Sequence, residues 1–261
     1  MNWRPWCKKP IKILKMPNFK ELSIVIVNYR SEKYLGKCIS SIKEKILDAD
    51  YEIIVVNNDK EKLLEAQLPK EIRLINSGGN IGFGAACNLG AKSAQGEILC
   101  FLNPDTEIIS SSFSGVLYKF AKDNKLAIVG PKLVNEGGET QEWIAGGEIT
   151  IWSTILNNFG YKRDQKIWES VAPMECAWVS GAAMFIRKDI FDRLGGFDEK
   201  FFMYFEDSDL CRRARQLGYK VLYFPEFIVK HFGGKSWLDK KTQKAYYHKS
   251  QRRYFSKYFI K

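Results

Sequence analysis

The sequence predicts an α/β protein with a doubly wound, mostly parallel sheet in a single domain. Short apolar runs alternate with segments of helical spacing, as in successive βαβ units. The runs are apolar at nearly every position, which is typical of strands covered by helices on both faces. The chain has 261 residues, of which 45% are hydrophobic, and this is enough for one enzyme-sized domain with a substantial core.

The elements are predicted from these runs in chain order. In the first half, strands are expected at 22–27, 51–56, 71–75, 97–102 and 126–129, with a helix at 85–94. In the second half, strands are expected at 178–186, 220–224 and 228–231, with helices at 188–194 and 209–217. Asp209 is the predicted N-cap of the last helix. Residues 135–168 are rich in glycine and tryptophan, and we expect them to form loops and short elements that can make a binding surface, which is an acceptor surface if the protein is a transferase.

Both ends of the chain are basic. Residues 1–20 carry Lys and Arg without an acid and lack the apolar core of a signal peptide, so we expect a basic leader. Residues 239–261 are predicted to form a basic amphipathic helix. Its aromatic face is expected either to dock on the protein body or to lie on an anionic membrane; that face consists of Tyr247, Tyr254, Phe255 and Tyr258.

Composition narrows the functional classes. The net charge of +11 favours polyanionic partners such as lipid headgroups or phosphorylated ligands. The six cysteines form no CxxC pair, which argues against zinc and disulfides and favours a cytoplasmic protein. The longest apolar runs are far shorter than the roughly 20 residues of a membrane-spanning helix.

Polar residues end several of the predicted strands. Asn28 and Tyr29 follow the first strand, Asn57 follows the second, and Asn103 follows the strand at 97–102. In parallel sheets, ligands bind beyond the carboxyl ends of the strands, so these residues are candidates for nucleotide contact. The alternative is that Asn simply forms turns.

Two nearby features are suited to a diphosphate. Asp105, beside Pro104, offers a hard oxygen ligand for Mg²⁺ or Mn²⁺ bridging two phosphates. The loop at 78–84, which contains Asn80 and Gly82, precedes a predicted helix and is a place where backbone N–H groups can face phosphate. It is not a dinucleotide fingerprint, because the GxGxxG order is absent.

Later residues complete the candidate site. Glu206 and Asp207 follow an aromatic run, and apolar neighbours raise a carboxyl pKa towards the range of a general base. His231 ends a predicted strand and is either a structural histidine or an additional metal ligand. Lys235 and Ser236 lie in the following loop, which is expected to close over pyrophosphate.

In chain order, several segments resemble glycosyltransferase family 2, in particular its rhamnosyltransferase-like branch: LSIVIVNYRSEKYL, YEIIVVNND, NSGGNIGFGAACNLG, EILCFLNPDTEI, WVSGAAMFIR, GGFDEKFFMYFEDSDLCRRARQLGY and HFGGKS. The resemblance covers roughly residues 21–236. It implies a Rossmann-like GT-A fold and inverting transfer of one sugar, such as rhamnose, from a dTDP- or UDP-type donor. The implied acceptor is a saccharide or polyprenyl-linked sugar in cell-surface polysaccharide synthesis, at a cytoplasmic or membrane-peripheral location.

The resemblance also assigns roles to residues. It makes Asp105 a metal ligand, His231 a metal or phosphate contact, and Asp207 the catalytic base with Glu206 as the nearest competitor. Asn57 stands where the family usually has Asp, so nucleotide preference stays open. The QxxRW signature of processive synthases is missing, which favours single addition. We expect a nucleotide-sugar-binding half at 21–130 and an acceptor and catalytic half at 131–238, within a transferase domain at 21–238.

Three rival functions are considered. A basic nucleic-acid-binding module would fit the charge and the aromatic tail, but it leaves Asp105 and Asp207 unexplained, so nucleic acid is not an expected partner. A sugar nucleotidyltransferase would need a glycine-rich basic loop after the first strand, where Asn28 to Ser31 stand. An inactive relative that only binds is disfavoured by the acids at both key positions.

Overall fold

The computed structural model describes residues 21–61, 68–110, 113–158, 162–233 and 239–260. The strands of the first half are β1 (Leu22–Asn28), β2 (Tyr51–Asn57), β3 (Arg73–Asn76), β4 (Ile98–Leu102), β5 (Thr106–Ile108) and β6 (Leu126–Val134). Those of the second half are β7 (Ala145–Gly146), β8 (Met174–Cys176), β9 (Trp178–Val179), β10 (Ala183–Arg187) and β11 (Lys220–His231).

Nine of the described strands form one sheet in the order β3-β2-β1-β4-β10-β6-β11-β5, with β8 paired to β11, while β7 and β9 form a separate pair. Strands β3, β2, β1 and β4 are all parallel. Strand β10 is antiparallel to both of its neighbours, so the second half mixes directions. The predicted α/β fold is confirmed, and its strictly parallel part consists of β3, β2, β1 and β4.

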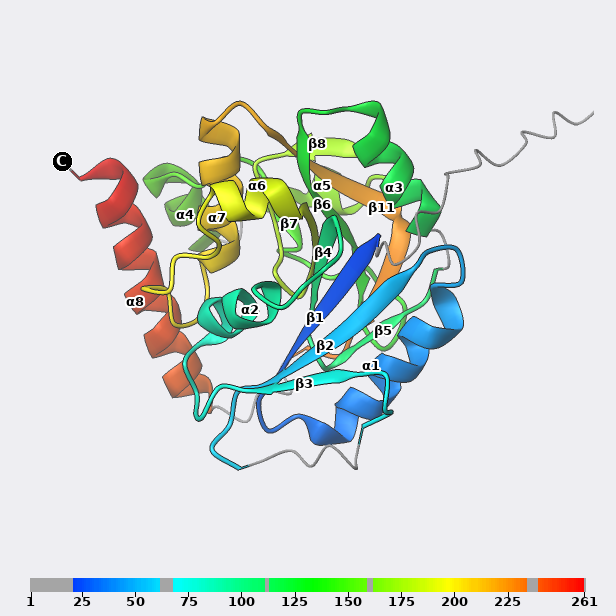
Figure 1. Ribbon diagram of the computed structural model, residues 1–261. Coiled ribbons are helices and arrows are strands. Elements are labelled where there is room, and N and C mark those ends of the chain that lie inside the picture. Colours follow the sequence, from blue (N-terminus) through cyan, green and yellow to red (C-terminus); the bar gives the residue numbers. More distant parts are fainter. Residues whose placement is uncertain (1–20, 62–67, 111–112, 159–161, 234–238, 261) are drawn as a thin grey trace, which may run out of the picture.

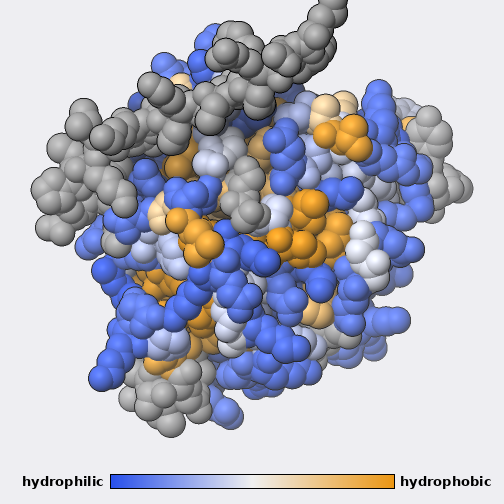
Figure 2. All heavy atoms as spheres, turned by 90° about the vertical axis from the view of Figure 1, so that its right-hand side faces the viewer, coloured by the Kyte–Doolittle hydropathy of each residue, from blue (hydrophilic) through white to orange (hydrophobic). Residues whose placement is uncertain are grey.

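The helices cover both faces of this sheet. They are α1 (Glu32–Lys45), α2 (Phe83–Ala91), α3 (Phe113–Lys122), α4 (Ile151–Asn158), α5 (Gln165–Trp168), α6 (Lys188–Arg193), α7 (Glu206–Gln216) and α8 (Lys240–Phe259). In Figure 1, α1 and α3 lie on one side of the sheet and α2, α6 and α7 on the other, with α8 outside this second group. Figure 2 shows that the outer surface on the α1 and α3 side is mainly hydrophilic.

Close packing of α2 on the sheet explains the apolar strand pattern. All residues of β1 and β4 are buried, as expected for strands covered on both faces. A Cβ atom at Gly90 of α2 would lie 2.4 Å from the Val25 side chain and 3.0 Å from Val56. Glycine therefore lets α2 approach β1 and β2 closely, which sets the loop before α2 beside the strand ends.

Three predicted element boundaries were wrong. The run at 178–186 is two strands in different sheets, because Ser180 to Ala182 interrupt it. The segments at 220–224 and 228–231 belong to one strand, β11, whose register with β6 shifts between Phe224 and Ile228. Helix α7 begins at Glu206, so Asp209 lies inside its first turn and is not its N-cap.

The C-terminal helix α8 docks on the protein body. Its Tyr254 side chain is buried in a small apolar cluster with Phe201 and Phe205, against which Phe255 and Tyr258 also pack. The docking alternative for the aromatic face is therefore the one observed. The predicted basic leader at 1–20 lies outside the described residues.

Candidate active site

One cavity of about 730 Å³ lies where the strand ends, the start of α7 and the segment after β6 meet. Its volume is within the usual range for a small-molecule site. The sequence-predicted residues that line it are Tyr29, Asn80, Gly82, Asn103, Asp105, Glu206, Asp207 and His231. Residues from the predicted acceptor loops line it too: Trp143, Gly147, Ile149, Ser153, Thr154, Arg163 and Asp164.

Asn28 and Asn57 lie behind the cavity instead of lining it. They are paired across β1 and β2, where Asn28 Nδ2 donates to Asn57 Oδ1 at 3.3 Å. Asn57 Nδ2 donates to Asn76 Oδ1 at 3.2 Å and to a loop carbonyl. The side chain that reaches the cavity is the next one, Asn58, because successive residues of a strand point to opposite faces.

Asn58 organises the glycine-rich loop. Its Oδ1 accepts from Ile81 N at 3.0 Å, and its Nδ2 donates to Asn80 Oδ1 at 3.2 Å. Gly82 has a φ of 92°, in the region that favours glycine, and a Cβ there would lie 2.7 Å from the Phe202 carbonyl oxygen. That carbonyl also accepts from the first N–H of α2, at Phe83, so this N–H is not free for phosphate.

Asp105 and His231 come together from segments 126 residues apart in sequence. Strand β5 pairs with the end of β11, with Thr106 opposite His231. This places His231 Nε2 3.5 Å from Asp105 Oδ1 and 3.5 Å from Asn103 Nδ2. Both side chains are about one-sixth exposed, at 17% and 15%, and both line the cavity.

Gln141 holds the imidazole from the other side. Its Oε1 lies 3.0 Å from His231 Nδ1, and its Nε2 donates to the His231 carbonyl oxygen at 2.6 Å. Sequence analysis missed this residue because it lies 90 positions away in the chain. Within the described ranges, no cluster of three or more His, Cys, Asp or Glu side chains is placed to hold a metal ion.

Glu206 and Asp207 open helix α7 at the centre of the cavity. The preceding residues, Tyr204 and Phe205, both have a φ of 67°, an uncommon conformation for non-glycine residues. This turn sends the chain abruptly into the helix. The two carboxyl groups then lie in its first turn, where the helix dipole favours negative charge.

The two carboxyl groups differ in their hydrogen bonds. Asp207 Oδ2 accepts from Gly181 N at 2.9 Å, and its Oδ1 accepts from Ser208 N at 2.6 Å. Glu206 Oε2 is buried with no partner among the described residues. Burial raises the pKa of Glu206 well above its ordinary value, and the nearby Asp207 charge adds to the effect.

Burial also raises the pKa of Asp207, but the bonds from Gly181 and Ser208 act against it by stabilising the ionised form. Because the two acids are neighbours, one proton held on Glu206 leaves a single negative charge on the pair. The environments therefore favour Glu206 as the neutral partner and Asp207 as the ionised one.

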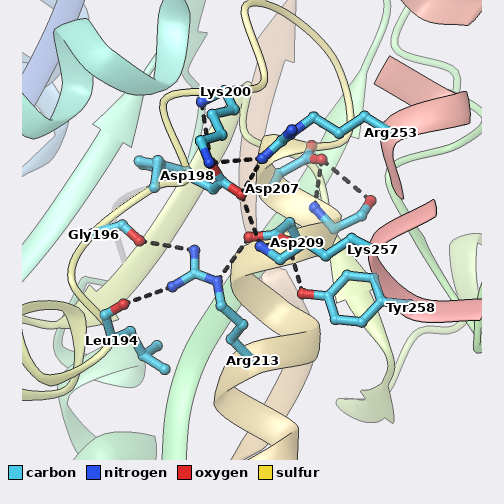
Figure 3. Close-up of polar contacts among 12 residues, drawn as sticks. Leu194, Gly196, Asp198, Lys200, Asp207, Asp209, Arg213, Arg253, Lys257 and Tyr258 are labelled. Atoms are coloured by element: carbon cyan, nitrogen blue, oxygen red, sulfur yellow. Dashed lines mark hydrogen bonds and ion pairs between the residues drawn. The ribbon is translucent and has the colours of Figure 1, made fainter. Parts of the chain in front are cut away.

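A network of charges ties α8 to the first turn of α7 (Figure 3). Asp209, fully buried, accepts from Arg213 Nε at 2.7 Å, Lys257 Nζ at 2.6 Å and Tyr258 Oη at 2.7 Å. Lys257 also binds Asp198 at 2.8 Å. A buried carboxylate needs such partners, so α8 holds the turn that carries the two cavity acids.

Lys235 and Ser236, predicted as phosphate-loop contacts, lie outside the described residues. No helix in the described part of the chain combines the length and apolar character needed to cross a bilayer.

A mixed α/β sheet whose strand ends and acids surround one cavity is the architecture of a protein that binds a small ligand beyond the carboxyl ends of its strands. The chain belongs to glycosyl transferase family 2, whose family model matches residues 23–195. It is thus a nucleotide-sugar-dependent, inverting glycosyltransferase and not a nucleotidyltransferase.

Three curated relatives illustrate the family. The low-salt glycan biosynthesis hexosyltransferase Agl10 of Haloferax volcanii is 29% identical over 75% of this chain and 62% of its own length. Rhamnosyltransferase WbbL of Escherichia coli K12 is 28% identical over 90% of this chain and 87% of its own. The N-acetylglucosaminyl-diphospho-decaprenol L-rhamnosyltransferase of Mycobacterium tuberculosis is 25% identical over 88% and 82%.

Solved structures share the fold at lower identity. GalNAc-T7, determined with UDP, GalNAc and Mn²⁺, aligns with a TM-score of 0.61 at 18% identity, over 83% of this chain and 44% of that one. The Pyrobaculum calidifontis mannosyltransferase PcManGT, determined with GDP-Man and Mn²⁺, aligns with a TM-score of 0.56 at 17% identity, over 89% and 63%. These likenesses establish the GT-A-type fold.

Proposed function

We propose that this family 2 enzyme is metal-dependent and transfers one sugar, with rhamnose as the first candidate, from a dTDP- or UDP-type donor to a saccharide or lipid-linked acceptor. One observation carries the proposal. A single cavity contains Asp105 and His231 at the strand ends and Asp207 at the start of α7. Within one cavity, the first two groups can hold a diphosphate-bound cation and the third can remove a proton from the acceptor.

The donor nucleotide is assigned to the end of the cavity formed by the strand termini. Tyr29, Asn58, Asn80 and Asn103 line that end, and their side chains offer a ring face, amides and carbonyl oxygens to a base and ribose. Asn28 and Asn57 support this surface from behind, through the bonds that fix the ends of β1 and β2. The rhamnosyltransferase relatives favour rhamnose as the first sugar to test.

Asp105 and His231 fit a divalent cation. One carboxylate oxygen and one imidazole nitrogen 3.5 Å apart are suitable ligands for Mg²⁺ or Mn²⁺, and a site with two protein ligands leaves positions for phosphate oxygens and water. When bound there, the ion would neutralise charge on the departing diphosphate. The Mn²⁺ in both aligned structures is consistent with this assignment.

Asp207 acts as the general base. Its carboxylate accepts the proton of the acceptor hydroxyl while that oxygen bonds to the anomeric carbon, and the bond from that carbon to the diphosphate breaks on the opposite face. This displacement inverts the configuration, in agreement with the family's inverting stereochemistry. The Gly181 N–H bond at 2.9 Å holds one carboxylate oxygen and thereby orients the base.

The acceptor is proposed to reach the enzyme at a membrane surface on the cytoplasmic side. The mycobacterial relative is named for a diphospho-decaprenol acceptor, which is a lipid. The outward face of α8 carries exposed cations that can bind anionic headgroups; they are Lys240, Lys241, Lys244, Lys249 and Arg252.

The test is to incubate the purified chain with dTDP-, UDP- and GDP-sugars, each with Mn²⁺, Mg²⁺ or EDTA, and to measure nucleoside diphosphate release. We expect release from a pyrimidine-nucleotide sugar only with a divalent cation. Equal release in EDTA would remove the metal from the proposal, and release from GDP-sugars alone would remove the pyrimidine donor.

A further inference from the structure

A second polar pair lies in the part of the cavity formed by residues 143–178. Gly146 pairs with Trp178 across the small sheet of β7 and β9. A Cβ atom at Gly146 would lie 2.5 Å from Trp178 Nε1 and 2.6 Å from Asp164 Oδ2. These two polar atoms therefore lie close to the same point, and glycine is required at position 146 because a Cβ atom would clash with both.

Both atoms lack a hydrogen-bond partner among the described residues, although the rest of the Asp164 side chain is well held. Asp164 Oδ1 accepts from Gly147 N at 3.0 Å and from Arg163 Nε at 3.4 Å. The carboxyl side chain is only 9% exposed, yet Asp164 and Trp178 both line the cavity. Asp164 Oδ2 is not among the fully buried side-chain atoms without a partner, so it is open to the cavity and can accept a hydrogen bond from a ligand.

The pair is connected to the base by a short segment of chain. Trp178 lies three residues before Gly181, whose N–H binds Asp207, and the next carbonyl, of Ala182, accepts from Asn103 N at 2.9 Å. Residues 178–182 thus run from the Asp164 pair, past the base, to the strand end assigned to the donor. The pair and the donor strand end are therefore at opposite ends of this segment, and the proposed mechanism puts the acceptor at the end away from the donor.

The surroundings match a sugar ring. Trp143 lines the cavity, is 41% exposed and has a φ of 60°, a strained conformation of the kind that clusters at binding sites. Adjacent hydroxyls of a pyranoside can donate to a carboxylate and accept from an indole N–H, while the C–H face of the ring packs on an aromatic surface.

We propose that Asp164 and Trp178 form the subsite that binds the acceptor saccharide, with Asp164 Oδ2 accepting from one hydroxyl and Trp178 Nε1 donating to its neighbour. The inference rests on the proposed function, since it assigns the acceptor of that same reaction. It makes these two residues determinants of acceptor specificity. A lipid-linked acceptor would place its sugar here and its lipid outside the cavity.

The test uses Trp178→Phe, which keeps an aromatic ring but removes the N–H, and Asp164→Asn. Trp152→Phe and Asp192→Asn are matched controls, because both residues are exposed and outside the cavity lining. Binding of methyl glycosides of rhamnose, glucose, galactose, mannose and N-acetylglucosamine is followed without donor by saturation-transfer NMR. With donor present, transfer to the bound glycoside is compared with hydrolysis of the donor by water.

We expect each site variant to bind the glycoside about tenfold more weakly, the loss for one hydrogen bond of about 1.4 kcal/mol, and to lower the ratio of transfer to hydrolysis. The proposal is overturned if wild type binds no glycoside, if the variants bind like the controls, or if donor hydrolysis falls in step with transfer. A failure of the proposed function would give a different result. Wild type would then release no nucleoside diphosphate from any donor, and glycoside binding would still test the subsite. Thermal unfolding of each variant verifies the fold.

Discussion

Gln141 Oε1 lies 3.0 Å from His231 Nδ1. Because an amide oxygen only accepts, this contact requires a hydrogen on Nδ1 and leaves Nε2 as the ring nitrogen on the Asp105 side. A second bond from Gln141 to the His231 carbonyl fixes the backbone at the same point. Such outer contacts orient metal-binding histidines and select their tautomer.

The first prediction concerns this contact. Gln141→Leu should weaken Mn²⁺ binding by about 10- to 100-fold, the usual effect of losing an outer-shell partner, while Gln141→Glu should retain part of the affinity through its carboxylate oxygen. Electron paramagnetic resonance titration of free Mn²⁺, in the presence of a nucleoside diphosphate, measures this directly. Gln165→Leu, on the exposed face of α5, is the control, and equal Mn²⁺ affinity in all four proteins would contradict the prediction.

The second prediction concerns Asp105. Asp105→Ala removes the only carboxylate that lies next to His231 among the described residues, so Mn²⁺-dependent binding of the nucleotide donor should be lost. Calorimetric titration of the donor, with Mn²⁺ and with EDTA, separates metal-dependent from metal-independent binding. Asp189→Ala, on the exposed side of α6, should bind normally. Donor affinity in Asp105→Ala that still responds to Mn²⁺ would contradict the assignment.

The strand ends were predictable because their pattern is local. Three apolar runs of the first half, those at 22–27, 51–56 and 97–102, end in polar residues, and parallel strands bring such ends to one edge of a sheet. The pattern therefore predicted that Asn103 and Asp105 lie at the same edge of the sheet as the ends of the first two strands. The sequence did not show whether Asn57 or Asn58 faces the cavity. Neighbouring side chains point to opposite faces of the sheet, and the apolar pattern does not reveal which face the last residue of the strand occupies.

Contacts between distant segments were not predictable from one sequence. Gln141 lies in a loop with no periodic pattern, and its bond to His231 arises only because β11 and the segment after β6 are neighbours. The early start of α7 depends on the positive φ values at Tyr204 and Phe205, which residue preferences oppose. The pair at Asp164 and Trp178 likewise needed the register of β7 against β9.

The third prediction concerns pH and stability. A carboxyl group whose pKa is raised in the folded state binds its proton more tightly there than in the unfolded chain. The stability that this proton provides is fully present below the unfolded-state pKa, and it is lost as the pH rises through the folded-state pKa. Glu206 is such a group. Glu206→Gln should therefore be more stable than wild type at pH 8 and about equal at pH 4. Each kcal/mol regained would raise the melting temperature by about 2 to 4 °C; a lower melting temperature at pH 8 would contradict the prediction.

The fourth prediction concerns α8. Deleting this helix would remove Tyr254 from its cluster with Phe201 and Phe205. It would also remove the Lys257 and Tyr258 hydrogen bonds to Asp209, so a truncation cannot test membrane binding alone. Replacing the exposed Lys240, Lys241, Lys244 and Lys249 by Gln leaves those contacts intact. At about 1 kcal/mol per cation near the surface, the loss of four cations should weaken binding to anionic liposomes by up to about a thousandfold, so we expect the replaced protein to float with them far less than wild type. Salt should weaken the wild-type interaction, and equal flotation with neutral and anionic lipids would contradict it.

The last prediction identifies the base. Burial raises the pKa of Asp207, and a base works only when ionised, so turnover should fall as pH drops through that raised pKa, earlier than for an ordinary aspartate. Asp207→Asn keeps the shape and should lower turnover by a factor on the order of a hundred to ten thousand, with donor affinity preserved because Asp105 and His231 are untouched. Glu206→Gln should retain much more activity, since Glu206 Oε2 has no described partner and Glu206 holds the proton of the pair. Single-turnover transfer, measured across pH in both variants, decides between the two acids. If Glu206→Gln lost most activity and Asp207→Asn stayed active, Glu206 would be the base. Full activity in both variants would exclude both acids as the base.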